Sequence, residues 1–316
     1  MTHARQALNA WIKFEGWNKD KQLGRAMRAV YSPEDIRKTY EPIEDHRHTR
    51  HIIQEYARNT ADIRDVGLFG LDLGFVRHVL DLGCGYGFFT EKLRERLHES
   101  AYIEGLDVID RNNSEAFVDT VEAIGYNGEF RQGSADLIQD MEAESYDLII
   151  ASYSLYFFPH LIPDIARILA PGGIFIAVTH SRFSLQEITR FIPGCMQMIG
   201  IPPPDDIAIN ALLTAFSMEN GASMLNPYFG RVEKILYEND LLFPLDQVID
   251  CIDYLEKKKH LILKDVAERY PQKLDDMLSC FNRKVFEHAR LHGEVIITKD
   301  DAIFRCFNPH EGNTIV

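Results

Sequence analysis

The stretch with the clearest chemical meaning is VLDLGCGYGFF, residues 79–89, in which Gly83, Gly85 and Gly87 follow an apolar run. Glycine-rich turns after a strand let the main chain approach a ligand closely, and many of them hold phosphate. Here Asp81 stands two residues before the first glycine. Its carboxylate would repel a phosphate, so the pattern favours a ligand that is positively charged where it meets the turn.

Two common phosphate ligands are disfavoured by the same stretch. A dinucleotide turn follows G-x-G-x-x-G, and its third glycine lets the helix pack closely on the strand. Phe88 occupies the position of that glycine, and the stretch also lacks the Gly-Lys-Ser/Thr of a nucleoside triphosphate loop. Neither a nicotinamide dinucleotide nor a nucleoside triphosphate is therefore expected.

S-adenosylmethionine fits these residues better, because it carries an ammonium and a sulfonium and no phosphate. Its ribose needs a group that accepts hydrogen bonds from both hydroxyls. An acidic residue at the end of the next strand, about 20 residues past the turn, usually does this. Asp107 lies 20 residues after Gly87. The alternative is that Asp107 caps a helix.

Several side chains that could move a proton follow the later strands. They are His160, His180 and Tyr156, with Tyr153 and Ser154 beside them. Histidine has an ordinary pKa suited to general base catalysis near neutral pH. The alternatives are that the histidines pack against loops and that the tyrosines form the walls of a pocket.

The surrounding chain alternates short apolar runs with helical segments. The expected strands are 75–82, 101–108, 128–134, 146–157 and 173–181, and the expected helices are 88–100, 113–125 and 161–173. This alternation predicts a parallel sheet with helices on both faces. Ligands of such sheets bind at the carboxyl ends of the strands, where the glycine turn and the candidate bases lie.

Outside this region the pattern is mostly helical. Ser32 is expected to cap a helix that begins at Pro33. Residues 230–243 predict a strand with a bend, and 293–307 a strand pair or one strand with a bulge at 299–301. The expected segments are an N-terminal helical cap (1–65), a cofactor-binding core (66–181), a helical cap insertion (182–229), a late core strand (230–244), a helical insertion (245–291) and C-terminal core strands (292–316).

Five ordered blocks together resemble the class I S-adenosylmethionine-dependent methyltransferases, in their small-molecule branch. The blocks are VLDLGCGYG, IEGLDV, GSADL, YDLIIASYSLYFF and LAPGGIFIAVTHS, within 75–181. The resemblance implies a Rossmann-like, mostly parallel seven-stranded α/β sheet with helices on both faces and a helical cap. It also implies S-adenosylmethionine as the cofactor.

The resemblance further implies positions for the cofactor. Asp81 would lie near the amine, Asp107 would hold the ribose, and Asp136 would approach the adenine, although Asp136 could equally cap a helix. The implied cofactor-binding residues are Asp81, Gly83, Cys84, Gly85, Gly87, Asp107, Val108, Ser134, Ala135, Asp136, Ala151 and Ser152. The family has no fixed general base, so the resemblance does not choose among His160, His180 and Tyr156.

Composition narrows the partners. Lys and Arg number 34 and Asp and Glu 48, a net charge of −14, which argues against a nucleic-acid partner. Five widely spaced cysteines with no CxxC pair indicate reduced thiols in a cytoplasmic protein. No signal-peptide pattern and no membrane-length apolar run is present, so no membrane partner is expected.

The segment HRHTRH places His46, His48 and His51 close together. Only the last two share a helix face, so a surface helix near the cofactor mouth is expected rather than a metal site. The sequence therefore predicts methyl transfer to a small organic acceptor under a helical cap. Non-methylating chemistry in the same pocket (decarboxylation or hydroxylation), or a non-catalytic partner subunit, is the alternative, and a homo-oligomer is left open.

Overall fold

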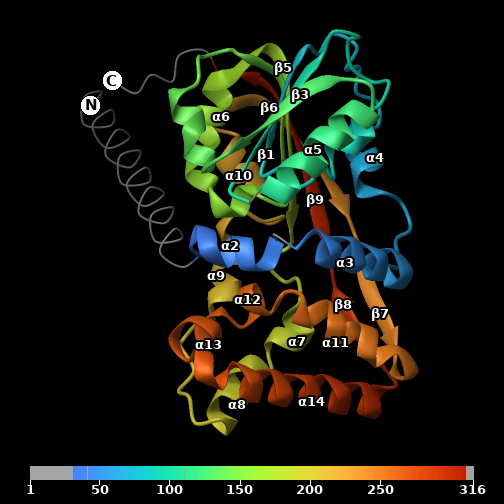
Figure 1. The fold of residues 1–316 in the computed structure, drawn as a ribbon, viewed down its shortest axis with the longest axis vertical. Helices are drawn as coiled ribbons and strands as arrows, with labels where there is room; N and C mark the ends of the chain where they lie inside the picture. Colours follow the sequence, from blue (N-terminus) through green and yellow to red (C-terminus); the bar gives the residue numbers. More distant parts are fainter. Residues whose placement is uncertain (1–30, 41, 110, 311–316) are drawn as a thin grey trace, which may run out of the picture.

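The computed structural model describes residues 31–40, 42–109 and 111–310 (Figure 1). Residues 1–30 of the expected N-terminal cap and 311–316 of the expected C-terminal segment lie outside this description. The oxygen of Ser32 accepts a hydrogen bond from the Asp35 amide at 3.2 Å. This contact confirms Ser32 as the cap of the helix that begins at Pro33.

A seven-stranded sheet forms the upper half of the molecule in Figure 1, in the order β3-β2-β1-β4-β5-β9-β6. Its strands are β1 (His78–Leu82), β2 (Tyr102–Asp107), β3 (Asn127–Gln132), β4 (Tyr146–Ser152), β5 (Leu169–His180), β6 (Phe229–Tyr237) and β9 (Asp301–Pro309). The first five in this order run parallel, and β9 is antiparallel to both of its neighbours. The predicted mostly parallel seven-stranded fold is confirmed.

Helices cover both faces of this sheet. One face carries α4 (Ile63–Leu68), the 3-10 helix η1 (Thr90–Leu93) and α5 (Arg111–Ala123), and the other carries η2 (Ala135–Asp140) and α6 (Ile162–Ile168). Successive strand residues point to opposite faces. Accordingly Val79 of β1 is buried with Phe117 of α5, whereas Leu80 is buried with Ile165 of α6.

The helix expected over 88–100 is the largest local difference from the sequence prediction. Only the short helix η1 forms there, followed by turns. Glu95 has a φ of 58°, in the left-handed region, which a continuous right-handed helix does not contain. The apolar side chains of this segment therefore pack against the sheet although the segment does not form a regular helix.

Two segments expected to be core strands are each divided between two sheets. Residues 230–243 form β6 and then β7 (Asp240–Pro244), and 293–307 form β8 (Glu294–Thr298) and then β9. Strand β7 pairs with β8 in a separate two-stranded sheet, so β8 and β9 are not the expected strand pair. The division lies at Asn239, whose amide donates to the Asp300 carboxylate at 2.9 Å.

The two pairs make one long ribbon that runs from the large sheet into the lower half of the molecule (Figure 1). Helices α2 and α3 cross the middle, and α8 and α11–α14 lie below them. These cap elements are α2 (Pro33–Tyr40), α3 (Ile43–Tyr56), α7 (Gln186–Thr189), α8 (Ile192–Met198), α9 (Ala208–Ala215), α11 (Val248–Glu256), α12 (Lys259–Ile262), α13 (Lys264–Arg269) and α14 (Leu274–His292). Helix α10 (Gly221–Leu225) instead packs on β6 and β9.

Candidate functional site

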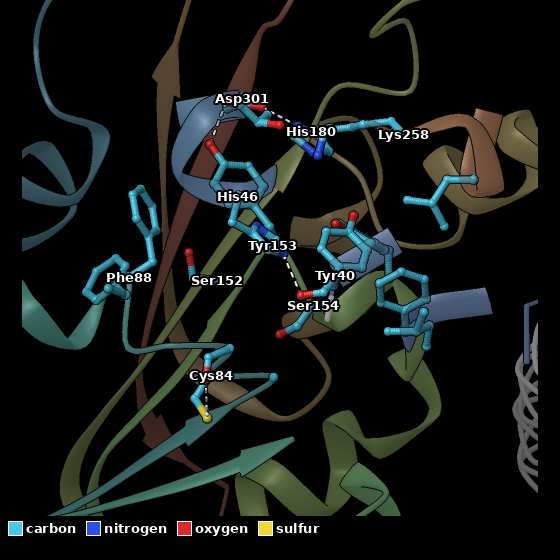
Figure 2. A pocket seen from close by; sticks show the side chains of 18 of the residues that line it. Tyr40, His46, Cys84, Phe88, Ser152, Tyr153, Ser154, His180, Lys258 and Asp301 are labelled. Atoms are coloured by element: carbon cyan, nitrogen blue, oxygen red, sulfur yellow. Dashed lines mark hydrogen bonds and ion pairs between the residues drawn. The ribbon is translucent and has the colours of Figure 1, made fainter. Parts of the chain in front are cut away.

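A cavity of about 790 Å³ lies between the carboxyl ends of the strands and the cap. This volume is within the range of small-molecule sites, about 300–1,000 Å³. We call one side the turn end, made by Asp81, Gly83, Cys84, Gly85, Asp107, Val108, Ser134, Ala135, Asp136 and Ser152. The opposite side is the cap end, made by Tyr153, His180, Lys258, Lys299 and Asp301. Figure 2 shows Cys84 at one extreme and His180, Lys258 and Asp301 at the other.

The three glycines of the turn have different reasons to be glycine. All have positive φ, at 72°, 53° and 85° for Gly83, Gly85 and Gly87. A Cβ on Gly83 would lie 2.4 Å from the Cβ of Ser154, and one on Gly87 would lie 2.9 Å from the Thr120 methyl group. At Gly85 a Cβ would meet nothing within 4 Å. Gly85 therefore faces open space, whereas its two neighbours permit close packing.

Asp107 at the end of β2 holds this turn in place. Its Oδ2 accepts a hydrogen bond from the Gly85 amide at 2.8 Å, and its Oδ1 accepts one from Ile109 at 3.2 Å. Burial raises the pKa of Asp107 above its ordinary value. The two motifs that sequence spacing linked are thus in direct contact, and the carboxylate retains lone pairs for further donors.

Asp81 at the end of β1 is a buried carboxylate with one side-chain partner. It is 1% exposed, and its Oδ2 accepts a hydrogen bond from the Thr90 hydroxyl at 2.7 Å. Burial, with a smaller contribution from the charge of Asp107, raises the pKa of Asp81 to about 7. It forms no ion pair with any lysine or arginine that the structure describes, so a cationic ligand would supply the missing charge.

Ser134, and not Asp136, caps the short helix η2. The Ser134 oxygen accepts a hydrogen bond from the Asp136 amide at 3.3 Å, which removes the helix-cap interpretation of Asp136. The Asp136 carboxylate instead bonds the Ser134 hydroxyl at 2.8 Å and His160 Nε2 at 2.9 Å. His160 therefore lies at the turn end.

Most of the residues predicted to bind the cofactor line this cavity, with Gly87 and Ala151 as the exceptions. Gly87 packs on α5, and the side chain of Ala151, in β4, is fully buried in the hydrophobic core. The neighbouring Ser152 does face the cavity (Figure 2). Its hydroxyl oxygen is buried and has no hydrogen-bond partner in the described parts of the chain, so it is available to a ligand.

A buried carboxylate organises the cap end. His180 on β5 and Asp301 on β9 are direct cross-strand partners, and His180 Nδ1 lies 2.6 Å from Asp301 Oδ1. The second oxygen of Asp301 accepts hydrogen bonds from the Tyr153 hydroxyl at 2.7 Å and the Lys299 ammonium at 3.1 Å. Sequence reasoning missed Asp301; its signal was a pair of acidic residues inside an apolar strand pattern.

The charges at the cap end make His180 suitable as a base. Burial opposes ionisation of Asp301, but Lys299 and the hydrogen bonds from His180 and Tyr153 lower its pKa below the ordinary value. Burial lowers the pKa of His180, although Asp301 partly opposes this. The carboxylate can only accept, so Nδ1 carries the proton and Nε2 retains its lone pair. His180 is therefore neutral at pH 7 and can take up a proton.

Two tyrosine rings lie against the imidazole of His180. The rings of Tyr153 and Tyr156 stack on His180 with centroid separations of 4.6 Å and 6.0 Å. Burial raises the pKa of Tyr156 well above its ordinary value, so the phenol keeps its proton and suits a pocket wall better than a base. Tyr153 has a φ of 55°, a strained conformation for a non-glycine residue that is common at functional sites.

The three histidines of α3 have separate partners. His46 lines the cavity, and its Nε2 lies 2.9 Å from the Tyr40 carbonyl oxygen. His48 contacts Asp253, and His51 lies 3.6 Å from Glu55. The helix thus closes one side of the cavity mouth, and His46 is more enclosed than the surface position expected from the sequence.

Comparisons with known proteins agree with this geometry. Residues 79–173 match the family model described as a methyltransferase domain. A demethylmenaquinone methyltransferase of Lactococcus lactis is 32% identical over 39% of this chain and 51% of its own length. A ubiquinone biosynthesis O-methyltransferase of Maricaulis maris is 30% identical over 34% of this chain and 41% of its own.

A third relative acts on RNA. The 23S rRNA (uracil(1939)-C(5))-methyltransferase RlmD of Haemophilus parainfluenzae is 33% identical over 41% of this chain and 27% of its own length. The chain thus spans about half, or less, of the curated relatives that it matches. None of the helices in the described ranges is long and apolar enough to cross a membrane. The match over residues 79–173 and the mostly parallel seven-stranded sheet confirm the resemblance to the class I S-adenosylmethionine-dependent methyltransferases that the sequence showed.

Proposed function

We propose that this protein transfers a methyl group from S-adenosylmethionine to a small organic acceptor enclosed by the helical cap. The observation that supports it most directly is the single cavity that joins the turn end to the cap end. One side of this cavity offers groups suited to the methyl donor, and the other offers a base. A donor and an acceptor can therefore lie in contact within it.

Residues of the turn end would hold the cofactor. The lone pairs that Asp107 keeps beyond its contacts with Gly85 and Ile109 suit the two ribose hydroxyls. The buried Asp81 suits the ammonium, and the unpartnered Ser152 hydroxyl lies between them and the cap end. Asp136, fixed by Ser134 and His160, would accept from the adenine amine.

S-adenosylmethionine, when bound, supplies a methyl group already activated by the sulfonium for in-line displacement. The chain must then orient the acceptor and exclude water, and positioning of this kind can supply about 7–11 kcal/mol. His180 Nε2 accepts the proton that a hydroxyl or an acidic carbon of the acceptor gives up. Asp301 holds the ring in the productive tautomer and stabilises the imidazolium that forms.

We propose a small-molecule acceptor rather than RNA, although one relative is named for RNA methylation. A phosphate-binding face needs clustered lysine and arginine, whereas this chain has a net charge of −14. Residues of α2 and α12 also line the cavity, so these helices would have to move to admit a polymer. The five cysteines are all unpaired, which supports a cytoplasmic location as a further part of the proposal. A homo-oligomer stays a prediction.

The first test is calorimetric titration of the purified protein with S-adenosylmethionine and S-adenosylhomocysteine. Asp107→Ala removes hydrogen bonds to a charged group that contribute about 1.5–3 kcal/mol each, so binding should weaken roughly 100-fold. Asp119→Ala, an exposed aspartate of α5, is the matched control. If the wild-type protein binds neither compound, the proposal is wrong.

The second test separates methylation from the alternatives. The protein is incubated with S-adenosylmethionine carrying a labelled methyl group and with either a small-molecule fraction or an RNA fraction of a cell extract. Labelled small molecules together with S-adenosylhomocysteine are expected. Label in RNA alone would contradict a small acceptor, and a bound cofactor that is never consumed would favour a non-catalytic subunit.

A further inference from the structure

Two lysines line the cap end of the cavity, and only one has a partner of opposite charge. The ammonium of Lys299 lies 3.1 Å from Asp301. Lys258, which precedes α12, forms no ion pair with any residue that the structure describes. Its ammonium lies 5.4 Å from the centre of the Tyr40 ring, a cation–π contact. Lys258 is therefore an uncompensated positive charge inside the cavity.

The titratable groups that face Lys258 do not supply the missing negative charge. His46 and His180 are close enough to be influenced by it, and burial together with Lys258 lowers the pKa of His46 to about 4. Both imidazoles are neutral at pH 7. Asp301 already forms hydrogen bonds with Lys299, His180 and Tyr153. The pKa of Lys258, lowered by burial and by Lys299 to about 8, still leaves most of the ammonium charged at pH 7.

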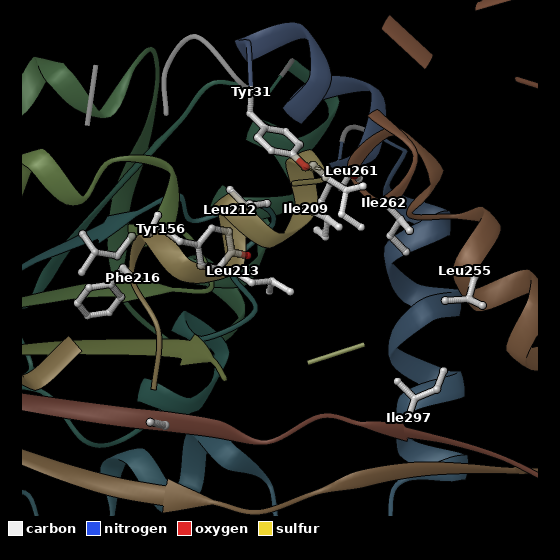
Figure 3. Close-up of a cluster of buried hydrophobic side chains, with 14 of the residues drawn as sticks. Tyr31, Tyr156, Ile209, Leu212, Leu213, Phe216, Leu255, Leu261, Ile262 and Ile297 are labelled. Atoms are coloured by element: carbon white, nitrogen blue, oxygen red, sulfur yellow. Dashed lines mark hydrogen bonds between the residues drawn. The ribbon is translucent and has the colours of Figure 1, made fainter. Parts of the chain in front are cut away.

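Apolar side chains make up the wall beside this lysine. Figure 3 shows residues of α9 and α12 in one cluster of buried apolar side chains, in which those of α9 are drawn nearest to Tyr156. The members of this apolar wall that line the cavity are Tyr156, Ile209, Leu212, Leu213, Leu261 and Ile262. An unpaired charge beside such surroundings costs free energy. Sites that carry this cost commonly use it to bind a ligand.

Resting on the proposed function, we propose that the acceptor is a small, largely apolar carboxylic acid. Its carboxylate pairs with Lys258, its apolar body lies against α9 and α12, and its nucleophilic group reaches His180. A single ammonium matches one negative charge, whereas a phosphate group is usually held by several donors. Within the described ranges no second free cation lies at this end, because Lys299 is neutralised by Asp301.

The test uses the full chain saturated with S-adenosylhomocysteine. Phenylalkanoic acids and medium-chain fatty acids are titrated by calorimetry, each beside the primary amide of the same skeleton. The wild-type protein should bind the acid at least tenfold more tightly than the amide. Lys258→Met should lose this preference and keep the affinity for the amide, and Lys258→Arg should retain part of it.

Lys259→Met is the matched control, because the next residue along does not line the cavity. It should behave as the wild type. Lys258→Met removes an unpaired charge, so its melting temperature without ligand should equal or exceed that of the wild type, which shows that the variant folds. Failure to bind S-adenosylhomocysteine would instead contradict the proposed function itself.

Three outcomes would overturn the acid assignment in a protein that has bound S-adenosylhomocysteine. The first is that the wild-type protein binds acids and amides equally well, and the second is that it binds no acid. The third is that Lys258→Met and Lys259→Met lose the preference for the acid to the same extent. Phenylphosphonate is included in the same titrations. Tighter binding of this phosphonate than of the matching carboxylate would also overturn it, in favour of a phosphate-bearing acceptor.

Discussion

Each end of the cavity buries a carboxylate, and the two carboxylates differ in how many partners the protein gives them. Asp301 at the cap end is surrounded by Lys299, His180 and Tyr153. Asp81 at the turn end has only the Thr90 hydroxyl. The protein itself satisfies the first charge, so Asp301 positions other groups. The second charge lacks a cation, and Lys258 at the cap end similarly lacks an anion. Each end thus leaves one charge for a ligand, of opposite sign at the two ends.

The variant His180→Ala should distinguish the two ends of the cavity most clearly, because it should affect kcat and not cofactor binding. Loss of a general base should lower kcat by about 10²–10⁴-fold. Binding of S-adenosylhomocysteine, which depends on the turn end, should stay within about twofold of the wild type. Asp107→Ala should show the reverse, with weak cofactor binding and kcat largely retained at saturating cofactor. If both variants lost binding to the same extent, the division of the cavity into two ends would be wrong.

The rise of kcat/KM with pH should reflect the ionisation of His180 and not that of Asp81. The pKa of His180 is lowered by burial, so kcat/KM should rise as pH increases through a value below 6.5. It should fall again near pH 8, where Lys258 loses the proton that binds the acceptor. The charge of Lys258 contributes to that lowering. Lys258→Met should therefore move the rising limb to higher pH. A nuclear magnetic resonance titration of the imidazole checks the same shift without an acceptor, and an unchanged midpoint would contradict it.

Stability should also distinguish the two carboxylates. Asp301→Asn leaves the Lys299 ammonium buried without its partner, and breaking such a pair costs about 3–5 kcal/mol of unfolding free energy. The double variant with Lys299→Met removes both charges and should recover part of this loss. Urea unfolding of Asp301→Asn, Lys299→Met, the double variant and the wild type measures the coupling. Additive losses would show that the two side chains do not depend on each other.

The turn end was predictable because the residues that form it follow one another at fixed spacing in a short part of the sequence. A strand, a turn with main-chain exposure and an acidic residue at the next strand end appear as glycines and aspartates at fixed spacing. The cap end was only half predictable. His180 was a candidate, but its partner Asp301 comes from a strand 121 residues later. Their contact depends on the antiparallel register of β5 and β9, which no local spacing encodes.

The same reasoning explains which parts of the fold were missed. Most of the parallel strands have apolar runs, so the alternation with helices predicted a parallel sheet, and the family resemblance implied its seven strands. The divisions at Asn239 and at Lys299–Asp300 lie where one ribbon passes from the pair β6–β9 of the large sheet to the separate pair β7–β8. Each strand pattern continues through the division, so the sequence shows one strand where the structure has two. Lys258 has no local sequence signal either, because its contact with Tyr40 of α2 joins segments far apart in the chain.

A smaller effect should reveal the unsatisfied charge of Asp81. Its folded pKa of about 7 lies above the unfolded value, so the protein without ligand loses stability as pH rises from about 4 to about 7. Asp81→Asn should remove this loss, which a shift of about three pKa units limits to at most about 4 kcal/mol of unfolding free energy at pH 8. Thermal melts at pH 5 and pH 8 compare the two proteins.

The same carboxyl should lose its proton when a cation binds. At pH 7 about half of the Asp81 side chains are protonated without ligand, and an adjacent ammonium lowers the pKa. Binding of S-adenosylmethionine should therefore release about half a proton, seen as a heat that varies with the ionisation enthalpy of the buffer. Asp81→Asn should abolish that variation. Proton uptake on binding would place the ammonium elsewhere.

The smallest expected effects compare glycines within the turn end. Alanine at Gly85 meets open space, so its cost is the left-handed φ alone, about 1–2 kcal/mol of unfolding free energy. Alanine at Gly83 has the same strain and also places a Cβ 2.4 Å from that of Ser154, and overpacking adds about 1–3 kcal/mol. In cofactor binding the order should reverse, because the new methyl group at Gly85 projects toward the cavity. Urea unfolding and S-adenosylhomocysteine titration of both variants test whether the order of the two variants reverses between stability and binding. If Gly83→Ala were the less destabilising change, the close contact between the turn and Ser154 would be wrong.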